Sequence, residues 1–201
     1  MDYRIISLTK NDVDRAAGVF SEAFRYDPLF EYAFGSFENY DRYAFWMFKT
    51  WVKWGVRYAD VWATEGFESV AIRRFPGSPG YNWLNMLKTG IAFTPFKVGI
   101  DITRRLNRVV GAVEKKHTAI MTNKPHVYCQ NLATREAFRG MGFGKALMEH
   151  TFIKAGQSGL PCYLETTTEK TMLIHRAKGY ELAETFSIEG TAFTVYVMIR
   201  P

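Results

Sequence analysis

Apolar residues near the start of the chain recur at the spacing of a helix. One helical face carries five of them: Val13, Ala16, Ala17, Phe20 and Phe24. This pattern predicts a helix after an opening strand at residues 3–9. Asn11 or Asp12 is expected to cap the helix, because both side chains accept hydrogen bonds from backbone amides. Asp27-Pro28 is expected to end it, because the residue before a proline is pushed out of the helical region.

The pattern then predicts a helix at residues 37–58 and a hairpin with strands at residues 60–65 and 69–75. Residues 78–123 are irregular and close with an amphipathic helix near residues 102–120. That helix carries a basic series: Arg104, Arg105, Arg108, Lys115 and Lys116. Two interpretations remain open, a solvated basic face or a cover that turns positive charge toward a bound anion.

After Pro125 strands and helices alternate more regularly. The predicted elements are a strand at 126–134, a helix at 142–157, a strand at 162–168, a helix at 169–178 and a closing hairpin at 180–199. Gly179 stands where a glycine commonly ends a helix. The order predicts a mixed α/β layer protein with one domain over residues 1–201.

Composition narrows the class of protein. Apolar residues make up 47% of the 201 residues and aromatic residues 16%, which is typical of a globular chain. The net charge of +6 suits an anionic partner, either a nucleic acid or a phosphorylated small ligand. The chain has no long basic run, no paired Cys/His zinc spacing and no known nucleic-acid module. We therefore expect a small anionic ligand, with no nucleic acid and no metal.

Cys129 and Cys162 lie in apolar, strand-like contexts and are expected to be free buried thiols, which fits a reducing compartment. The first residues lack the basic and apolar segments of a signal peptide. No apolar run approaches the ~20 residues that span a bilayer. The expected location is the cytoplasm, without a membrane partner.

The stretch "FRGMGFGKALMEH" at residues 138–150 places three glycines between a strand and a helix. The first turn of a helix leaves backbone N–H groups unpaired, and the helix dipole adds positive potential there. Glycines let a ligand approach the backbone closely. With Arg139 and Lys145 beside it, the turn is predicted to bind a phosphate or pyrophosphate. The spacing fits neither the dinucleotide fingerprint nor a Walker loop.

The pattern is R-x-x-G-x-G at Arg139, Gly142 and Gly144, and it follows "LAT" at residues 132–134. A second block, "YLETTTEKTMLIHRAKGYELAE", occupies residues 163–184. Together these blocks resemble the GNAT superfamily of N-acetyltransferases. The frame formed by H-x-Y, "YLET" and the closing M-x-R-P is most similar to the puromycin N-acetyltransferases and their bacterial relatives.

The resemblance implies an acyl-CoA N-acyltransferase fold, a mostly antiparallel mixed sheet flanked by helices, with acetyl-CoA as cofactor. The implied pyrophosphate-binding residues are Arg139, Gly140, Met141, Gly142, Phe143, Gly144 and Lys145. Leu132, Ala133 and Thr134 stand where the family pairs its strand edge with the pantetheine arm. Thr168 replaces an asparagine that often precedes the following helix and is expected to bind CoA. The acetyl group is expected where the strands at 126–134 and 162–168 splay apart.

The implied chemistry is direct transfer to an amine, which needs a base and is helped by an acid. His175 stands four residues before Gly179, where many relatives have a tyrosine acid, so it is the candidate acid. Glu165 is the candidate base, with a purely structural carboxylate as the alternative. The candidates for holding the acceptor amine are Asp27, Glu31 and Tyr128.

The preferred function is acetylation of a small-molecule amine. The alternatives are acetylation of a peptide or protein amine, and a CoA-binding domain without catalysis. A nucleic-acid binder ranks last. The sequence does not decide between a monomer and a homodimer.

Overall fold

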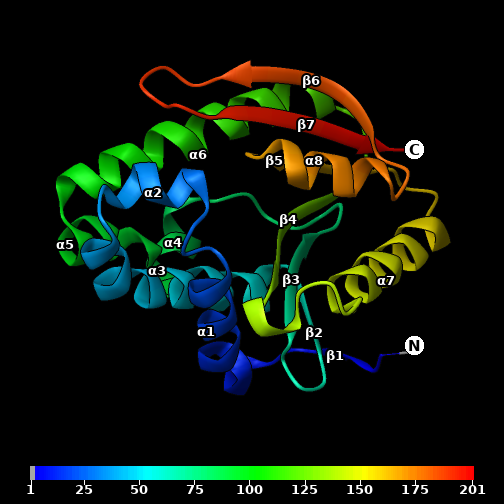
Figure 1. Ribbon diagram of the computed structural model, residues 1–201, viewed down its shortest axis with the longest axis horizontal. Coiled ribbons are helices and arrows are strands. Elements are labelled where there is room, and N and C mark those ends of the chain that lie inside the picture. The colour runs from blue at the N-terminus through cyan, green and yellow to red at the C-terminus, as the bar shows by residue number, and fades with distance from the viewer. Residues whose placement is uncertain (1–2) are drawn as a thin grey trace.

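The computed structural model describes residues 3–201 and contains one seven-stranded sheet (Figure 1). Its strands are β1 (Ile5–Ser7), β2 (Asp60–Thr64), β3 (Ser69–Arg74), β4 (Val127–Thr134), β5 (Cys162–Thr166), β6 (Glu181–Ser187) and β7 (Thr194–Arg200). They are arranged in the order β1-β2-β3-β4-β5-β7-β6. All neighbours are antiparallel except β4 and β5. The mixed, mostly antiparallel sheet confirms the predicted fold class.

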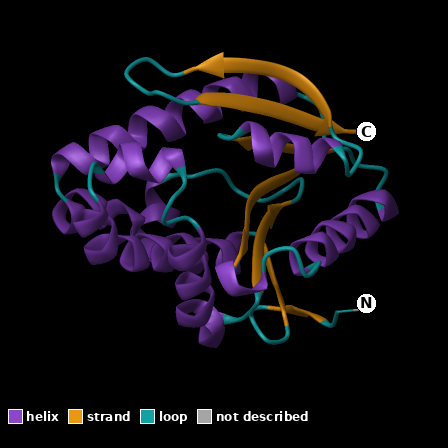
Figure 2. Ribbon diagram, viewed as in Figure 1, coloured by secondary structure: helices purple, strands orange, loops and turns teal. Residues whose placement is uncertain are grey.

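Helices lie on both sides of the sheet (Figure 2). They are α1 (Val13–Ala23), α2 (Pro28–Phe34), α3 (Phe37–Tyr58), α4 (Trp83–Thr89), α5 (Thr94–Val98), α6 (Ile100–Met121), α7 (Phe143–Gln157) and α8 (Glu169–Arg176). Short 3-10 turns, η1 (Lys10–Asp12), η2 (Ile91–Phe93) and η3 (Glu136–Phe138), join some of them.

Alternation along β3 separates the two layers of the core. Val70 and Ile72 pack with the apolar faces of α1, α2 and α3. Ala71, between them in the sequence, packs with Leu147 of α7 on the other face. A further cluster joins Leu164 of β5 to Met172 of α8. The sheet is therefore covered by α1–α3 on one side and by α7 and α8 on the other.

The strands β4 and β5 form a fork. Among the described residues they pair at two positions, Val127 with Cys162 and Tyr128 with Tyr163. Beyond Tyr128 β4 stays with β3, whereas β5 stays with β7. The fork is the strand splay that the resemblance implied.

A bulge in β4 lies just inside the fork. Ile72 is opposite Asn131, whereas Arg74 is opposite Tyr128. Two steps along β3 thus match three steps along β4, so the extra residue belongs to β4. Such a bulge re-aims the side chains that follow it.

Two expectations at the first helices were wrong. Neither Asn11 nor Asp12 caps α1 through its side chain; Thr9 accepts a hydrogen bond from the Asn11 amide, and the Asp12 carboxylate accepts one from the Thr9 amide at 2.8 Å. Asp27-Pro28 does not end a helix but begins α2, because the Asp27 carboxylate accepts a hydrogen bond from the Leu29 amide at 2.9 Å.

The basic helix α6 is not simply solvated. Its Arg105 donates to the Ala33 carbonyl at 2.9 Å, and Lys116 pairs with Glu184 of β6 at 2.6 Å. Arg108 donates to the Tyr32 hydroxyl at 3.1 Å. These contacts fix α6 against α2 and the closing hairpin, and α6 runs behind β6 and β7 in Figure 1. None of the helices in residues 3–201 is both long and apolar enough to cross a membrane.

Candidate active site

The glycine turn before α7 has the backbone that the sequence predicted. Gly140 and Gly142 adopt φ of 81° and 92°, a region that residues with a Cβ rarely enter. Gly142 precedes α7, and no side chain of residues 3–201 caps that helix. Tyr3 secures the turn by donating from its hydroxyl to the Met141 carbonyl at 2.6 Å. The first amides of α7 are therefore left without a side-chain partner at the cap among the described residues.

Gly144 brings the start of α7 close to the end of β4. A Cβ at this position would lie 2.9 Å from the Thr134 Oγ1. Thr134 is itself held by the Ser69 hydroxyl at 3.0 Å, and that hydroxyl also hydrogen-bonds the Ala133 carbonyl at 2.7 Å. The contact between helix and strand requires a glycine.

Gly144→Ala is expected to destabilise the protein by about 1–3 kcal/mol, because the added methyl group overpacks this contact. Chemical denaturation measures the change in the free energy of unfolding. Thr134→Ala removes the opposing hydroxyl, so the double variant should recover part of the loss. If the two losses simply add, Gly144 does not act through Thr134.

The charged side chains beside the turn are partly occupied. Arg139 donates to the Ala23 carbonyl at the end of α1 at 2.9 Å. Lys145 pairs with Glu149 along α7 at 3.4 Å. Thr168 caps α8, because its hydroxyl accepts a hydrogen bond from the Thr171 amide at 3.2 Å. Backbone amides, more than these side chains, are thus free to hold an anion.

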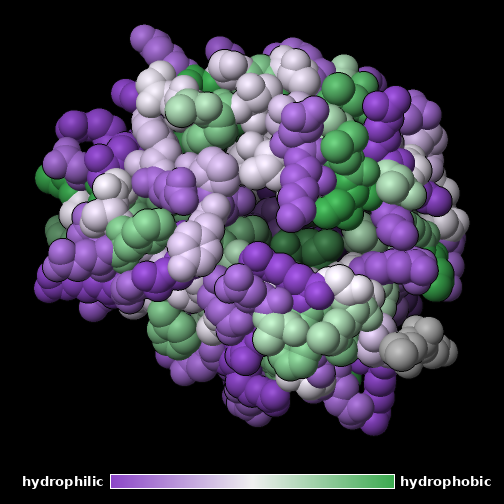
Figure 3. Space-filling model, in the orientation of Figure 1, coloured by the Kyte–Doolittle hydropathy of each residue, from purple (hydrophilic) through white to green (hydrophobic). Residues whose placement is uncertain are grey.

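Leu132, Ala133 and Thr134 line the fork on the side of β4. Their register partners in β3 are Ala71, Val70 and Ser69. Their other edge faces the space from which β5 has diverged. Figure 3 shows a shaded depression in this region, where Figure 1 draws β4 between α8 and the start of α7.

Glu165 occupies the other side of the fork, on β5. Burial raises the pKa of its carboxyl to about 7, although the Tyr163 and Tyr128 hydroxyls lower it in turn. The Oε1 atom is buried and has no hydrogen-bond partner among residues 3–201. The hydroxyl of Tyr163, which is also buried, has none in the same range. A carboxyl that changes protonation near neutral pH, with a free buried oxygen, has the properties of a general base.

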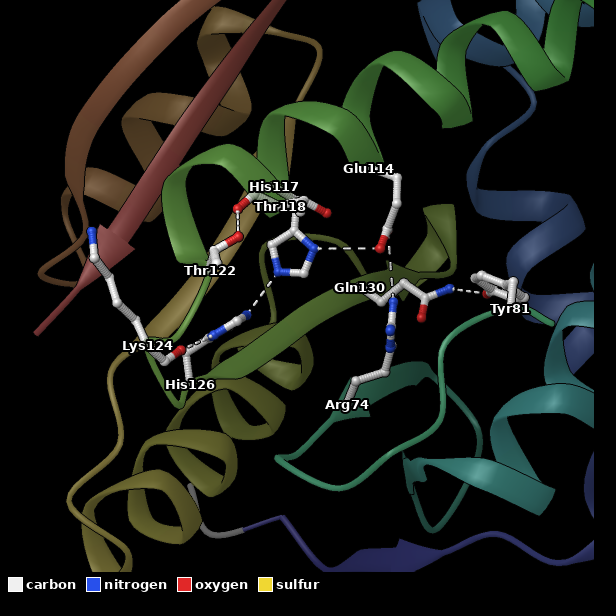
Figure 4. Close-up of polar contacts among 9 residues, drawn as sticks. All are labelled: Arg74, Tyr81, Glu114, His117, Thr118, Thr122, Lys124, His126 and Gln130. Atoms are coloured by element: carbon white, nitrogen blue, oxygen red, sulfur yellow. Dashed lines mark hydrogen bonds and ion pairs between the residues drawn. The ribbon is translucent and has the colours of Figure 1, made fainter.

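Three further charged or ionisable side chains gather between α6 and β3 (Figure 4). Glu114 and His117 extend from α6 toward the sheet, and Arg74 extends from β3. The Arg74 Nη1 lies 3.8 Å from the Glu114 Oε2. The guanidinium carbon of Arg74 is 5.5 Å from the Tyr128 ring centre. Burial is the main cause of the raised pKa of Glu165; Glu114 of this cluster raises it further, and His117 lowers it.

Sequence reasoning missed Arg74, Glu114 and His117. Glu114 and His117 are one helical turn apart on α6, and this spacing is the one signal that the sequence offers for them. Gln130, which follows Tyr128 on β4, donates to the Tyr81 hydroxyl at 2.5 Å. Residues 78–123 therefore contribute to the site directly.

Residues 81–178 match the model of the acetyltransferase (GNAT) family. This part of the chain is a GNAT acetyltransferase domain. The match covers the glycine turn, both strands of the fork and the polar residues of α6. No curated protein matches the chain in sequence.

Solved structures share the GNAT fold over almost the whole chain. One is a histone acetyltransferase HPA2 and related acetyltransferase from Corynebacterium glutamicum, with 16% identity, a TM-score of 0.65, and coverage of 100% of this chain and 97% of that chain. Arylalkylamine N-acetyltransferase 2 from Aedes aegypti has 10% identity, a TM-score of 0.65, and coverage of 100% and 99%. The Drosophila melanogaster polyamine N-acetyltransferase has 13% identity, a TM-score of 0.59, and coverage of 98% and 99%.

Asp27, the residue that caps the start of α2, contacts the residue that follows β5. The Thr167 hydroxyl, two residues after Glu165, lies 3.4 Å from both oxygens of the Asp27 carboxylate. Burial raises the pKa of Asp27 to about 6, against the hydrogen bond from the Leu29 amide. Glu31 is exposed on α2. Of the side chains predicted to hold an amine, Tyr128 lies beside Glu165, Asp27 lies beside Thr167, and Glu31 lies at the surface.

His175 lies on α8 with its ring buried. Burial, together with the charge of Arg73, lowers the pKa of His175 to about 4. The ring packs edge-on against Tyr180, with 5.5 Å between ring centres. An imidazole in this state is neutral at pH 7 and holds no acidic proton to spare. The acid role of His175 in this GNAT protein stays a prediction, and its lowered pKa counts against it.

His175→Gln is expected to leave the pH dependence of acetyl transfer unchanged. The unfolded chain binds a proton at this position below pH 6.5, whereas the folded protein does not until about pH 4. The free energy of unfolding of the wild-type protein should therefore fall as the pH drops from 6.5 to 4. In the variant it should fall less over the same range. Thermal unfolding across this range measures it. If His175→Gln instead lowers kcat and shifts the low-pH side of its pH profile, His175 is the acid.

Proposed function

We propose that this GNAT protein transfers an acetyl group from acetyl-CoA directly to the amine of a small molecule in the cytoplasm. The observation that carries the proposal is Glu165, whose pKa of about 7 and free buried oxygen lie at the fork of β4 and β5. The names of three structural neighbours refer to agmatine, polyamine and arylalkylamine acetylation, which supports a small amine as acceptor.

The residues around the fork fit acetyl-CoA. The uncapped amides after Gly142 suit the pyrophosphate, and the two glycines with positive φ keep side chains away from it. The edge of β4 at Leu132, Ala133 and Thr134 suits the amides of the pantetheine arm. Acetyl-CoA supplies an acetyl group activated as a thioester.

The side chains of the fork provide the proton chemistry. An amine is an ammonium ion at neutral pH and must lose a proton before it can attack. Glu165 takes this proton, because its carboxylate is a stronger base than an exposed glutamate. Asp27 and Tyr128 bind the amine beside it, and the aromatic rings of Tyr128 and Tyr163 exclude water. No cysteine is needed as a nucleophile, and Cys162 is buried.

Purified protein incubated with acetyl-CoA and an amine panel tests the proposal. The panel contains agmatine, a polyamine, an arylalkylamine and a peptide with a free N-terminus. Released CoA thiol and product mass are measured, and calorimetry measures CoA binding. We expect turnover of at least one small amine. Turnover of the peptide alone would favour a peptide or protein acceptor. Tight CoA binding without any turnover would favour an inactive domain.

A further inference from the structure

The region from α4 to the start of α6 exposes large apolar side chains at high density. Residues 83–100 hold six of the fifteen large apolar side chains that are exposed in residues 3–201. These six are 42–89% exposed, and we call them the α4–α5 surface: Trp83, Leu84, Leu87, Phe93, Phe96 and Ile100. They lie on connected elements, because α4 contacts η2, η2 contacts α5, and α5 contacts α6. Single exposed apolar residues are ordinary, whereas a cluster marks a binding surface.

Helix α4 has its polar side turned inward. Its two buried residues are Asn85 and Thr89, whereas Trp83, Leu84 and Leu87 are exposed. A helix that covers a core and faces water shows the reverse arrangement. Burial in the core of this protein therefore does not account for the apolar side of α4, which is left for a partner outside the chain.

Hydrogen bonds hold α4 in this orientation. The Asn85 Oδ1 accepts from the indole of Trp54 on α3 at 3.2 Å, and the Asn85 Nδ2 donates to the Gly80 carbonyl at 2.6 Å. Asn82 caps the helix by accepting from the Asn85 amide at 3.0 Å. Because Trp54 is fully buried, these contacts tie α4 to the core. The outward apolar side is thus a fixed feature of the fold.

The charge around the α4–α5 surface has one sign. Residues 75–100 contain Lys88 and Lys97 but no acidic residue. Lys53 of α3 lines an open hollow together with Lys97 and the ring of Phe96. All three lysines are exposed, and none forms an ion pair within residues 3–201. The surface therefore combines apolar side chains with unpaired positive charge.

An anionic lipid bilayer has the complementary chemistry. Segments that lie in a membrane interface bury Trp, Phe and Leu at the boundary of headgroups and acyl chains, while lysines extend to the headgroups. Anionic lipids attract lysines held close to the bilayer. A second copy of the chain fits less well, because a two-fold interface brings the same patch against itself. Lys88 and Lys97 would then meet Asp101 as the nearest acid in the sequence, and Asp101 already pairs with Arg104 at 3.6 Å.

We propose that the α4–α5 surface docks the protein on an anionic lipid bilayer. The six apolar side chains enter the interface, and Lys53, Lys88 and Lys97 bind lipid phosphates. Figure 1 draws α5 at the left edge of the molecule and α7 on the right, so docking leaves the glycine turn before α7 open. The proposal departs from the expectation of no membrane partner. That expectation rested on the lack of a spanning segment, which a docking surface does not need.

Sedimentation of the purified protein with lipid vesicles tests the proposal. The experiment uses neither acetyl-CoA nor an amine, so its outcome is independent of the proposed function. We expect binding to phosphatidylcholine vesicles that contain phosphatidylglycerol to be at least about tenfold tighter than to phosphatidylcholine alone. Binding should weaken as salt rises, because salt screens the lysines. No binding to the anionic vesicles, or equal binding to both kinds, overturns the proposal.

Tryptophan fluorescence reports whether the surface enters the bilayer. Trp83 is 67% exposed, so its emission should shift to the blue when anionic vesicles are added. Trp83→Phe keeps an aromatic ring and should keep binding while losing most of the shift. If the full shift remains in Trp83→Phe, α4 does not enter the interface and the proposed docking surface is wrong.

Two substitutions separate the apolar from the charged contribution. Phe96→Ser removes the most exposed of the six side chains and should weaken binding to anionic vesicles at least about tenfold. Its control is Ile153→Ser on α7, where the side chain is 60% exposed. Lys97→Glu should weaken binding at least about fivefold. Its control, Lys10→Glu in η1, makes the same change in net charge at another exposed site.

Both controls should bind like wild type, and all four variants should keep the wild-type Tm because the substituted side chains are exposed. If Phe96→Ser and Lys97→Glu bind like wild type, or if the controls lose as much affinity, the α4–α5 surface is not the docking site. Analytical ultracentrifugation separates the remaining case. A wild-type dimer that Phe96→Ser converts to a monomer would make this surface an interface between two copies and would overturn the bilayer as its partner.

Discussion

Glu165→Gln is expected to lower kcat for amine acetylation by about two to four orders of magnitude, the usual contribution of a general base. The amide has nearly the shape of the carboxylate but does not accept the proton of an ammonium ion. CoA binding should be unchanged, because the glycine turn lies at the far end of β4. Steady-state kinetics and calorimetry measure the two quantities. Glu189→Gln, at an exposed turn, is the matched control.

The pH dependence of the wild-type enzyme follows from the same carboxyl. Because the pKa of Glu165 is raised to about 7, the base is largely protonated at pH 6 and largely ionised at pH 8. The value of kcat/KM should therefore rise with pH through about 7, and this limb should disappear in Glu165→Gln. A limb that persists in the variant, or near-wild-type activity, would remove Glu165 from the mechanism.

Stability should change in the opposite direction to activity. The folded protein keeps the Glu165 proton up to about pH 7, whereas the unfolded chain loses it near pH 4.5. Between these values the folded state binds more protons, so wild-type stability falls as the pH rises. At pH 8 the penalty is on the order of 3 kcal/mol at most. Glu165→Gln should thus unfold at a higher temperature than wild type at pH 8, with a smaller gain at pH 5.

The sequence predicts the elements whose periodicity is long or whose ends are marked. The helix at residues 37–58 coincides with α3, and the strand and helix around the glycine turn lie within a residue of β4 and α7. The short α2 was missed because its start signal, Asp27 before Pro28, also fits the end of the preceding helix. A local pattern does not distinguish those two uses of the same pair.

The site is less predictable than the fold because its chemistry depends on burial. Glu165 was predicted as the candidate base on the strand that neighbours β4, but its raised pKa arises from its burial in the folded protein. His175 was chosen by its position before Gly179, and folding buries its ring in a way that no spacing reveals. Glu114 approaches the fork only because α6 folds back over the sheet.

Gly142→Val is expected to weaken CoA binding by at least about tenfold, equivalent to roughly 1.4 kcal/mol. Gly142 has φ of 92°, where a branched side chain is strained by about 1–3 kcal/mol. The backbone relieves this strain by rotating, and the first amides of α7 then no longer converge on one anion. Calorimetry with CoA measures the affinity, and the CoA-induced rise in Tm should shrink with it.

Gly156→Val on the same helix separates the turn from helix stability. A Cβ at Gly156 meets no atom within 4 Å, and valine favours a helix more than glycine does. This control should keep wild-type CoA affinity. If Gly142→Val also keeps it, the pyrophosphate does not bind at the start of α7. If the two variants lose affinity equally, the loss reflects the helix as a whole. Only a selective loss at Gly142 supports a diphosphate held by the amides of this turn, because the two substitutions differ in backbone geometry and not in the side chain added.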